Sequence, residues 1–537
     1  MVPAWHSGAI GVNPSAIRFA RLGVLFVLPQ SDRMIAMETA QQTAQRVKRR
    51  RSTVAVLAGA AVLVAGAAGL LTLVLSAGNQ GPPPPPGPAG RAMAAVGAVG
   101  AGSPASASDL GALIGDRRTW LRRHPHDDSS WAVLGSAYLE RGRWTGDPGD
   151  YPLAERALRR SLSVRPEESG NLDAMVGLAA LAHARGDYRV AKHYGEMVRA
   201  RSPQRWTTYA VLSDAYSRLG DQKAATTAVE KLGALGAAPG YTVGRLSAEV
   251  YWNRGWREDA AAALSDATAL AATPAEKAAG LNRMGDLAWE RGEAQEALGH
   301  YETALGVAPG HGRALAGRAR VLASLGLTDE AERVYRAALA ALPVPELGLE
   351  YGELLESRGK ADEAAEQYAL VRARVTLGAV RGRTGSDSGS GPGSGAGSGE
   401  LLLGLLDADH GDPGAAVARL RAEWKRHPNA YVADALGWAL YRDGDSDGEE
   451  ALKYARKATD QGLRSAVFLY HLGEIEMHLG KDGAARRHLA EALRVNPSFS
   501  PLLAPRAREA LGALGEPAEG GPRDVYGRAP TVRAAQR

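Results

Sequence analysis

The sequence of 537 residues contains no cysteine, only 4 phenylalanines, and a formal net charge of only +5. Without cysteine the chain has no disulfides, no thiol chemistry and no cysteine to carry the acyl anchor of a lipoprotein. Its 64 Lys and Arg residues are scattered among 59 Asp and Glu residues, with no basic stripe and interleaved aromatics, so we expect no nucleic-acid partner. The chain also lacks a Gly-rich phosphate loop followed by Lys and Ser or Thr, and it lacks His-Glu-x2-His. We therefore expect a protein that is not an enzyme, with no catalytic residue, metal, cofactor or small-molecule substrate.

One long apolar segment lies near the amino terminus. Val54 to Leu75 carries no charge, and at about 1.5 Å per residue a helix of this length crosses a bilayer. Five basic residues lie between positions 46 and 51, and no comparable cluster follows the segment. The positive-inside rule then places the amino terminus in the cytoplasm and the rest of the chain outside. We expect a single-pass protein of the cytoplasmic membrane; the alternative is a signal peptide cleaved near Val74-Leu75-Ser76.

The regions around this segment differ in composition. We expect residues 1–53 to be cytoplasmic and largely disordered, with the true start at Met1, Met34 or Met37. Residues 54–76 form the predicted transmembrane helix, and residues 77–108 form a linker rich in Pro, Ala and Gly. Five consecutive prolines, Pro82 to Pro86, favour an extended conformation of about 3.1 Å per residue, which makes a semi-rigid spacer.

Beyond the linker, a pattern of small and large residues recurs. Ala297-x3-Tyr301-x2-Ala304-x4-Pro309 is followed by Ala331-x3-Tyr335-x2-Ala338-x4-Pro343 and, further on, by Ala485-x3-Leu489-x2-Ala492-x4-Pro497. The leading alanines recur in steps of 33 to 37 residues, interrupted by one step of 52. They stand at positions 154, 191, 225, 260, 297, 331, 364, 416, 451 and 485. A period of this length is typical of a helical solenoid, in which each helix pair buries its apolar face against its neighbours.

The pattern resembles the tetratricopeptide repeat. The first copy matches it at six positions, Trp131, Leu134, Gly135, Tyr138, Ala154 and Pro166. It departs from the pattern by about seven extra residues between its two helices. The resemblance covers roughly residues 129 to 498 and implies an all-α fold, a tetratricopeptide-repeat solenoid of about ten helix pairs behind one transmembrane helix. Small residues at the eighth and twentieth positions allow two helices to approach closely, and a large residue at the twenty-fourth fills the gap to the next. Gly195 and Val229 replace that large residue in repeats two and three.

The step of 52 residues contains a low-complexity insert. Thr384 to Gly399 is almost entirely Gly and Ser, a composition that buries too little surface to order itself. We assign residues 109–383 to a first block of about seven repeats and 384–399 to a flexible insert. Residues 400–515 form a second block of about three repeats with a closing helix, and 516–537 form a disordered tail. We expect the two blocks to move relative to each other or to pack as separate arms.

The concave groove of the solenoid is the predicted binding site. In the repeat frame, positions 2, 5, 9, 12 and 13 of each first helix face this side. The residues supplied there are Arg245, Glu249, Trp252 and Asn253 in repeat four, Asn282, Asp286, Trp289 and Glu290 in repeat five, and Tyr431, Trp438, Tyr441 and Tyr470 in repeats nine and ten. Aromatic rings flanked by amides and charges suit an extended peptide. The sequence predicts a scaffold that binds protein or peptide partners to assemble other proteins; alternatively, Trp252 and Trp289 pack against the next helix and serve only the fold.

Two other functions follow from weaker patterns. Residues 118 to 138, Arg-x-Trp-Leu-x2-His-Pro-x5-Trp-x2-Leu-Gly-x2-Tyr, are similar to the opening of the periplasmic repeat domain of cytochrome c maturation factors. That resemblance implies a factor that holds apocytochrome chains for haem attachment. A hydrolase that uses the groove is the remote third alternative, and it has no motif in its favour.

Overall fold

Every element in the described part of the chain is a helix, and no strand occurs there. The computed structural model describes residues 88–97, 106–147, 149–383, 397–444, 448–460 and 462–515. All of them belong to the unit that spans residues 86–537. The predicted membrane span, most of the linker and insert, and the tail lie outside the described residues. Among the residues that are described, no helix is both long and apolar enough to cross a membrane.

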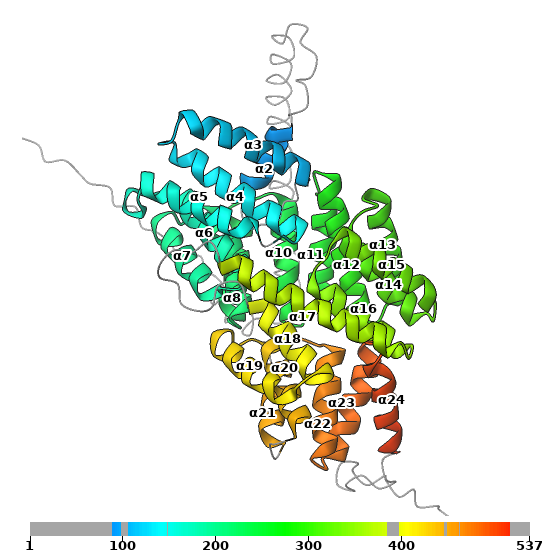
Figure 1. Cartoon of the computed structure of the whole chain (residues 1–537). Coiled ribbons are helices and arrows are strands. Elements are labelled where there is room, and N and C mark those ends of the chain that lie inside the picture. Colours follow the sequence, from blue (N-terminus) through cyan, green and yellow to red (C-terminus); the bar gives the residue numbers. More distant parts are fainter. Residues whose placement is uncertain are drawn as a thin grey trace, which may run out of the picture. The chain divides into compact units, whose positions relative to one another are not determined.

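Antiparallel helix pairs follow one another along the described residues, and each helix packs against its neighbours in the sequence (Figure 1). Repeats one to five are the pairs α4 (Asp128–Thr145) and α5 (Asp150–Val164), α6 (Leu172–Ala184) and α7 (Tyr188–Arg201), α8 (Trp206–Arg218) and α9 (Gln222–Ala234), α10 (Gly240–Asn253) and α11 (Arg257–Ala269), and α12 (Pro274–Glu290) and α13 (Ala294–Val307). Repeats six to ten are the pairs α14 (Gly312–Ser324) and α15 (Thr328–Ala341), α16 (Pro345–Ser357) and α17 (Ala361–Arg383), α18 (Gly397–His410) and α19 (Pro413–Arg426), α20 (Ala430–Asp443) and α21 (Glu449–Thr459), and α22 (Ala466–His478) and α23 (Asp482–Val495). These ten pairs within the described residues confirm the repeat count that the spacing predicts.

Additional helices cover both ends of the array. Helix α24 (Leu503–Ala513) packs on α23, at the place where the sequence predicts a closing helix. At the other end α2 (Pro88–Gly97) and α3 (Ala107–Arg123) pack on α4. The sequence interpretation assigned residues 77–108 to a linker, whereas the structure has helix α2 within this range. Its alanine-rich sequence favours a helix, and the burial of Ala92 and Val96 in the first core cluster stabilises it.

Side chains at the helix ends explain where several of the pairs begin. Thr273 caps α12 by accepting a hydrogen bond from the backbone of Glu276, whose carboxylate accepts from the Thr273 backbone in return. Pro274 occupies the first helical position, where its missing N–H costs nothing. Glycines with positive φ make the turns within most pairs, for example Gly255 and Gly326.

Close packing at the predicted small positions confirms the repeat frame. A Cβ added to Gly285, at the eighth position, would lie 2.6 Å from the ring of Tyr301, at the twenty-fourth. A Cβ on Gly317 of the next repeat would lie 2.3 Å from the same ring. In repeat two, where Gly195 replaces the large residue, Leu212 of the next repeat fills the space, and a Cβ on Gly195 would lie 2.7 Å from it. The irregular repeat two is therefore still closely packed, because a leucine of repeat three fills the space that its own large residue would occupy.

The array continues across the Gly/Ser-rich insert. Leu402, Leu403 and Leu406 of α18 share a buried cluster with Leu354 of α16 and Val371 of α17. The expectation of separately packed arms is therefore wrong. Residues 397–399, assigned to the insert, already belong to α18.

Turns of the last repeats also contact turns of repeats three to five. A Cβ on Gly220 would lie 2.6 Å from the carbonyl oxygen of Pro428, and one on Gly292 would lie 2.7 Å from that of Val495. Gly255 approaches the carbonyl of Gly462 in the same way. We call these three contacts the turn ladder, because each rung is one repeat further along both partners. In Figure 1 the yellow-to-red helices α19–α24 accordingly lie below α8–α16.

Candidate partner-binding face

Trp252 lies in the interface between repeat four and the last repeats. The residue is 8% exposed and shares a buried cluster with Ala430, Ala433 and Phe468. Trp289 is 5% exposed, and its backbone carbonyl accepts a hydrogen bond from Asn496 at 2.7 Å. These positions match the alternative in which both rings pack within the fold.

Two of the predicted residues meet each other across the array. The Tyr431 hydroxyl lies 3.4 Å from the side-chain oxygen of Asn253, which belongs to repeat four. Tyr431 stands at the start of repeat nine, so residues predicted in separate parts of the groove share one site. Its side chain is 40% exposed although it is surrounded by charged groups of repeats three to five.

Arginines and carboxylates surround Tyr431 on what we call the inner face. Its charged members come from α8, α10 and α12 and are Asp214, Arg218, Arg245, Glu249, Arg283, Asp286 and Glu290. Arg218 lies 3.6 Å and Arg245 3.8 Å from Glu249, which belongs to a neighbouring helix in the first case and to the same helix in the second. Arg283 lies 3.5 Å from Asp286. These separations exceed direct N–H···O hydrogen-bond lengths, so the pairs are loose.

The carboxylate of Asp286 is held by two neutral groups. Tyr301 donates to it at 2.9 Å and the side-chain amide of Asn282 donates at 3.2 Å. Arg283 and Arg218 are the most exposed arginines of the inner face, with 43% and 45% of their side chains exposed. Guanidinium groups that remain hydrated and loosely paired are suited to bind carbonyl or carboxylate groups.

Enclosure by protein shifts the titration of this face. Burial, and then the charge of Glu249, raise the pKa of Asp214 to about 7. Burial alone would also raise the pKa of Glu249, but the nearby Arg218, Arg283 and Arg245 lower it to about 2. One carboxyl of this pair therefore stays ionised while the other titrates near neutral pH.

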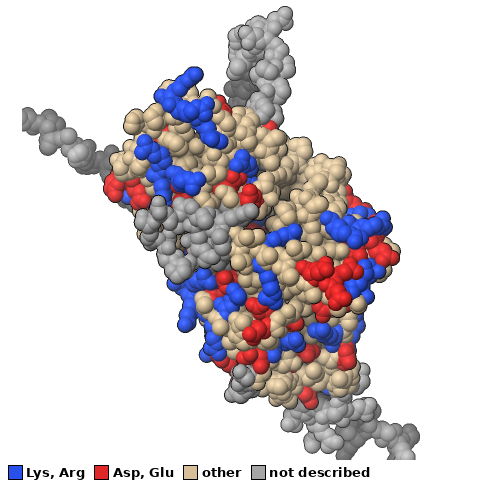
Figure 2. All heavy atoms as spheres, viewed as in Figure 1, with Lys and Arg blue, Asp and Glu red and all other residues tan. Residues whose placement is uncertain are grey.

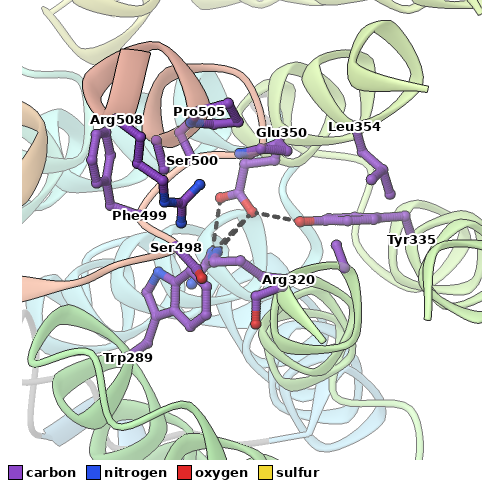
Figure 3. A pocket seen from close by; sticks show the side chains of 14 residues that line it. Trp289, Arg320, Tyr335, Glu350, Leu354, Ser498, Phe499, Ser500, Pro505 and Arg508 are labelled. Atoms are coloured by element: carbon purple, nitrogen blue, oxygen red, sulfur yellow. Dashed lines mark hydrogen bonds and ion pairs between the residues drawn. The ribbon is translucent and has the colours of Figure 1, made fainter. Parts of the chain in front are cut away.

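A pocket of about 180 Å³ lies beside Trp289, between repeats five to seven and the segment before α24. Figure 3 shows Arg320 and Glu350 joined at its centre, with Trp289, Phe499 and Arg508 around them. The two charges are 2.9 Å apart, and the Tyr335 hydroxyl donates to Glu350 at 3.3 Å. The pocket is thus a small polar space whose central charges are already paired.

The predicted residues of the second block serve mainly its core. Trp438 is buried, donates to Asp409 at 3.0 Å and stacks on His471, whose ring centroid is 4.1 Å away. Tyr470 is also buried, whereas Tyr441 is partly buried and its ring centroid lies 5.2 Å from that of Trp438. The structure does not bring this group together with Arg245, Asn282 and the rest of the inner face.

The sequence interpretation missed Arg218 and Arg283. Both stand on first helices, one in repeat three and one in repeat five, and the same helices carry carboxylates at the ninth position, Asp214 and Asp286. An arginine close to a carboxylate at the ninth position is the sequence signal that could have identified these two residues. Over the lower part of the side shown in Figure 2, Lys and Arg are mixed with Asp and Glu. In the part of the chain that is described, no three His, Asp or Glu side chains gather as metal ligands.

The stacked antiparallel pairs, with small residues at fixed positions, define a helical repeat protein. The family model of the tetratricopeptide repeat matches residues 282–344 and 436–501, which are parts of repeats five, six, nine and ten. These matched segments are tetratricopeptide repeats, and repeats of this family point to protein partners and a scaffold role.

Comparison with solved structures gives likenesses of low TM-score. The crystal structure of the APC/C hetero-tetramer Cut9–Hcn1 is 15% identical, with 76% of this chain and 82% of that chain covered and a TM-score of 0.37. A tetratricopeptide repeat protein from Parabacteroides merdae is 17% identical, with 52% and 100% covered and a TM-score of 0.30. The MamA protein is 22% identical, with 32% and 91% covered and a TM-score of 0.26. No curated protein matches the chain.

Proposed function

We propose that the chain is a scaffold without catalytic activity that binds an extended segment of a protein partner on its inner face. The observation that carries the proposal is the convergence of Arg218, Arg283 and Tyr431 from two distant parts of the array. Loosely paired guanidiniums bind backbone carbonyls and acidic side chains, and the tyrosine ring adds apolar contact. An extended segment exposes its backbone carbonyls together with its acidic and apolar side chains, whereas in a folded domain the backbone carbonyls are paired within the domain.

We further propose that the repeats act outside the cytoplasm, anchored by Val54 to Leu75. The support is the uncharged segment with its five preceding basic residues in the sequence. A reporter that is active only in the cytoplasm, fused after Arg537, should then be silent, while the same reporter fused before residue 46 should be active. Activity of the carboxy-terminal fusion would reverse this topology.

The binding proposal is tested by affinity capture with the full chain and identification of bound proteins by mass spectrometry. Arg218→Ala combined with Arg283→Ala should weaken capture of a reproducible partner by about 2 kcal/mol or more, the scale of a binding hot spot. The matched control is Arg336→Ala combined with Arg494→Ala, since these two side chains are 57% and 66% exposed in pairs away from the inner face. Equal capture by both double variants would remove the inner face as the binding site.

A further inference from the structure

Hydrogen bonds between the same turns accompany the three contacts of the turn ladder. Asn429 donates to the carbonyl of Arg218 at 2.8 Å, and Asn496 donates to that of Trp289 at 2.7 Å. Between these rungs Arg257 donates to the carbonyl of Arg464. Each bond joins residues more than 200 positions apart, so the ladder exists only while the last repeats lie against repeats three to five.

The ladder lies directly beside the inner face. The backbone carbonyl of Arg218 accepts the hydrogen bond from Asn429, and the guanidinium of the same residue belongs to the inner face. Tyr431 follows two residues after Asn429, so the rung fixes the start of α20 and thereby the position of the ring. Separation of the turns would remove Tyr431 from the two arginines and would open that side of the face.

From this geometry we infer that the turn ladder is a clasp. When closed, it holds repeat nine against one side of the inner face, where Arg218, Arg283 and Tyr431 stay 40–45% exposed and so within reach of small molecules. Its opening admits the bulkier partner segment. This inference rests on the proposed function, because it concerns access to the same face.

The closed form is the predominant one. Opening exposes the buried cluster that Trp252 and Leu287 form with Ala430 and Phe468, which is unfavourable in water. The open form is therefore a minor state. The binding free energy of a partner that binds only to this form must offset the free energy of opening.

The absence of cysteine allows a direct test of access without any partner. Arg283→Cys places a single thiol on the inner face, and Asp259→Cys places one on the exposed outer side of α11. Each thiol is treated with iodoacetamide, which is small, and with a maleimide that carries a bulky polyethylene glycol chain. We expect both thiols to react with iodoacetamide, and the inner thiol to react with the bulky reagent roughly tenfold more slowly than the outer one.

Isosteric variants then open the clasp without adding bulk. Asn429→Asp and Asn496→Asp keep the side-chain oxygens that cap Val432 and Ser498 but place an acceptor against a carbonyl. Together they should raise the rate of the bulky reagent at the inner thiol severalfold, with circular dichroism unchanged. Asn171→Asp is the matched control, because Asn171 also caps a helix and donates to carbonyls, but only within repeats one and two.

Two outcomes would overturn the clasp. One is an inner thiol in the otherwise unchanged protein that reacts with the bulky reagent as fast as the outer thiol. The other is a double variant that reacts no faster than the Asn171→Asp control. Neither result bears on whether a partner binds, which the capture experiment decides separately.

Discussion

Asn429 binds Arg218 across 211 positions of sequence, through a hydrogen bond of 2.8 Å from its side-chain amide to the backbone carbonyl. The oxygen of the same side chain accepts from the backbone of Val432 at 3.1 Å and so caps α20. One residue therefore fixes both the start of a helix and the contact between repeats three and nine. Several consequences of such contacts are measurable.

The first prediction compares two glycines with the same backbone conformation. Gly255 and Gly326 have φ of 78° and 79°, but a Cβ on Gly255 meets the carbonyl of Gly462, whereas one on Gly326 meets nothing. Alanine at either site costs about 1–2 kcal/mol because of the left-handed conformation. Gly255→Ala should cost a further ~1–3 kcal/mol for the clash in the turn ladder. Urea denaturation of both variants measures the difference, and equal losses would show that the turns are not in contact.

The second prediction concerns the ring of Tyr301 between two helices. Gly317→Ala forces a methyl group into that ring, so the free energy of unfolding should fall by about 1–3 kcal/mol. Gly299→Ala, in the exposed middle of α13, meets no atom and should instead raise it by up to about 1 kcal/mol. Thermal denaturation of the two variants should therefore shift in opposite directions. A loss of stability in both would mean that the frame of repeats five and six is misplaced.

The third prediction is a pH dependence that arises from Glu353. Burial, followed by the charges of Asp409, Glu350 and Glu356, raises its pKa from 4.5 to about 8. The folded protein thus keeps a proton that the unfolded chain loses, so this group lowers stability as the pH rises from about 4.5 towards 8. Glu353→Gln should equal the unchanged protein near pH 4 and exceed its stability by about 1 kcal/mol or more near pH 8.

Denaturation midpoints measured over that pH range test the prediction. Glu363→Gln is the control, because Glu363 is an exposed carboxylate of the neighbouring helix. Parallel pH curves for Glu353→Gln and the unchanged protein would contradict the raised pKa.

The fourth prediction separates packing from binding at tryptophan. Trp252→Ala removes a ring buried against Ala430 and Phe468, so it should cost ~3–5 kcal/mol of stability. Trp256→Ala should cost much less, because Trp256 is 41% exposed, with Tyr251 tilted against its ring and Arg254 over its face. If Trp252→Ala abolished partner capture with an unchanged melting temperature, the ring would be a binding residue after all.

Local features of the fold were predictable because they depend on neighbouring residues. The spacing of Ala297, Tyr301 and Pro309 already determines one helix pair, and Leu502 to Leu514 predicts the closing helix that covers the last pair. The contact of Gly255 with Gly462 was not predictable in this way. It depends on the small rotation between successive repeats, which accumulates over five of them and leaves no periodic mark in the sequence. For the same reason Trp252 was predicted to lie in an open groove, although repeats nine and ten cover it.

The turn ladder also bears on how such a chain can change in evolution. Repeat arrays commonly lengthen or shorten by duplicating or losing one unit, since each unit contacts only its neighbours. Here the turn of repeat three must meet the turn before repeat nine, and the turns of repeats four and five must meet their partners in the same register. One unit gained or lost between repeats five and nine would displace every rung together. The stretch between the rungs is therefore held at a fixed number of units, while the two ends of the array remain free to grow.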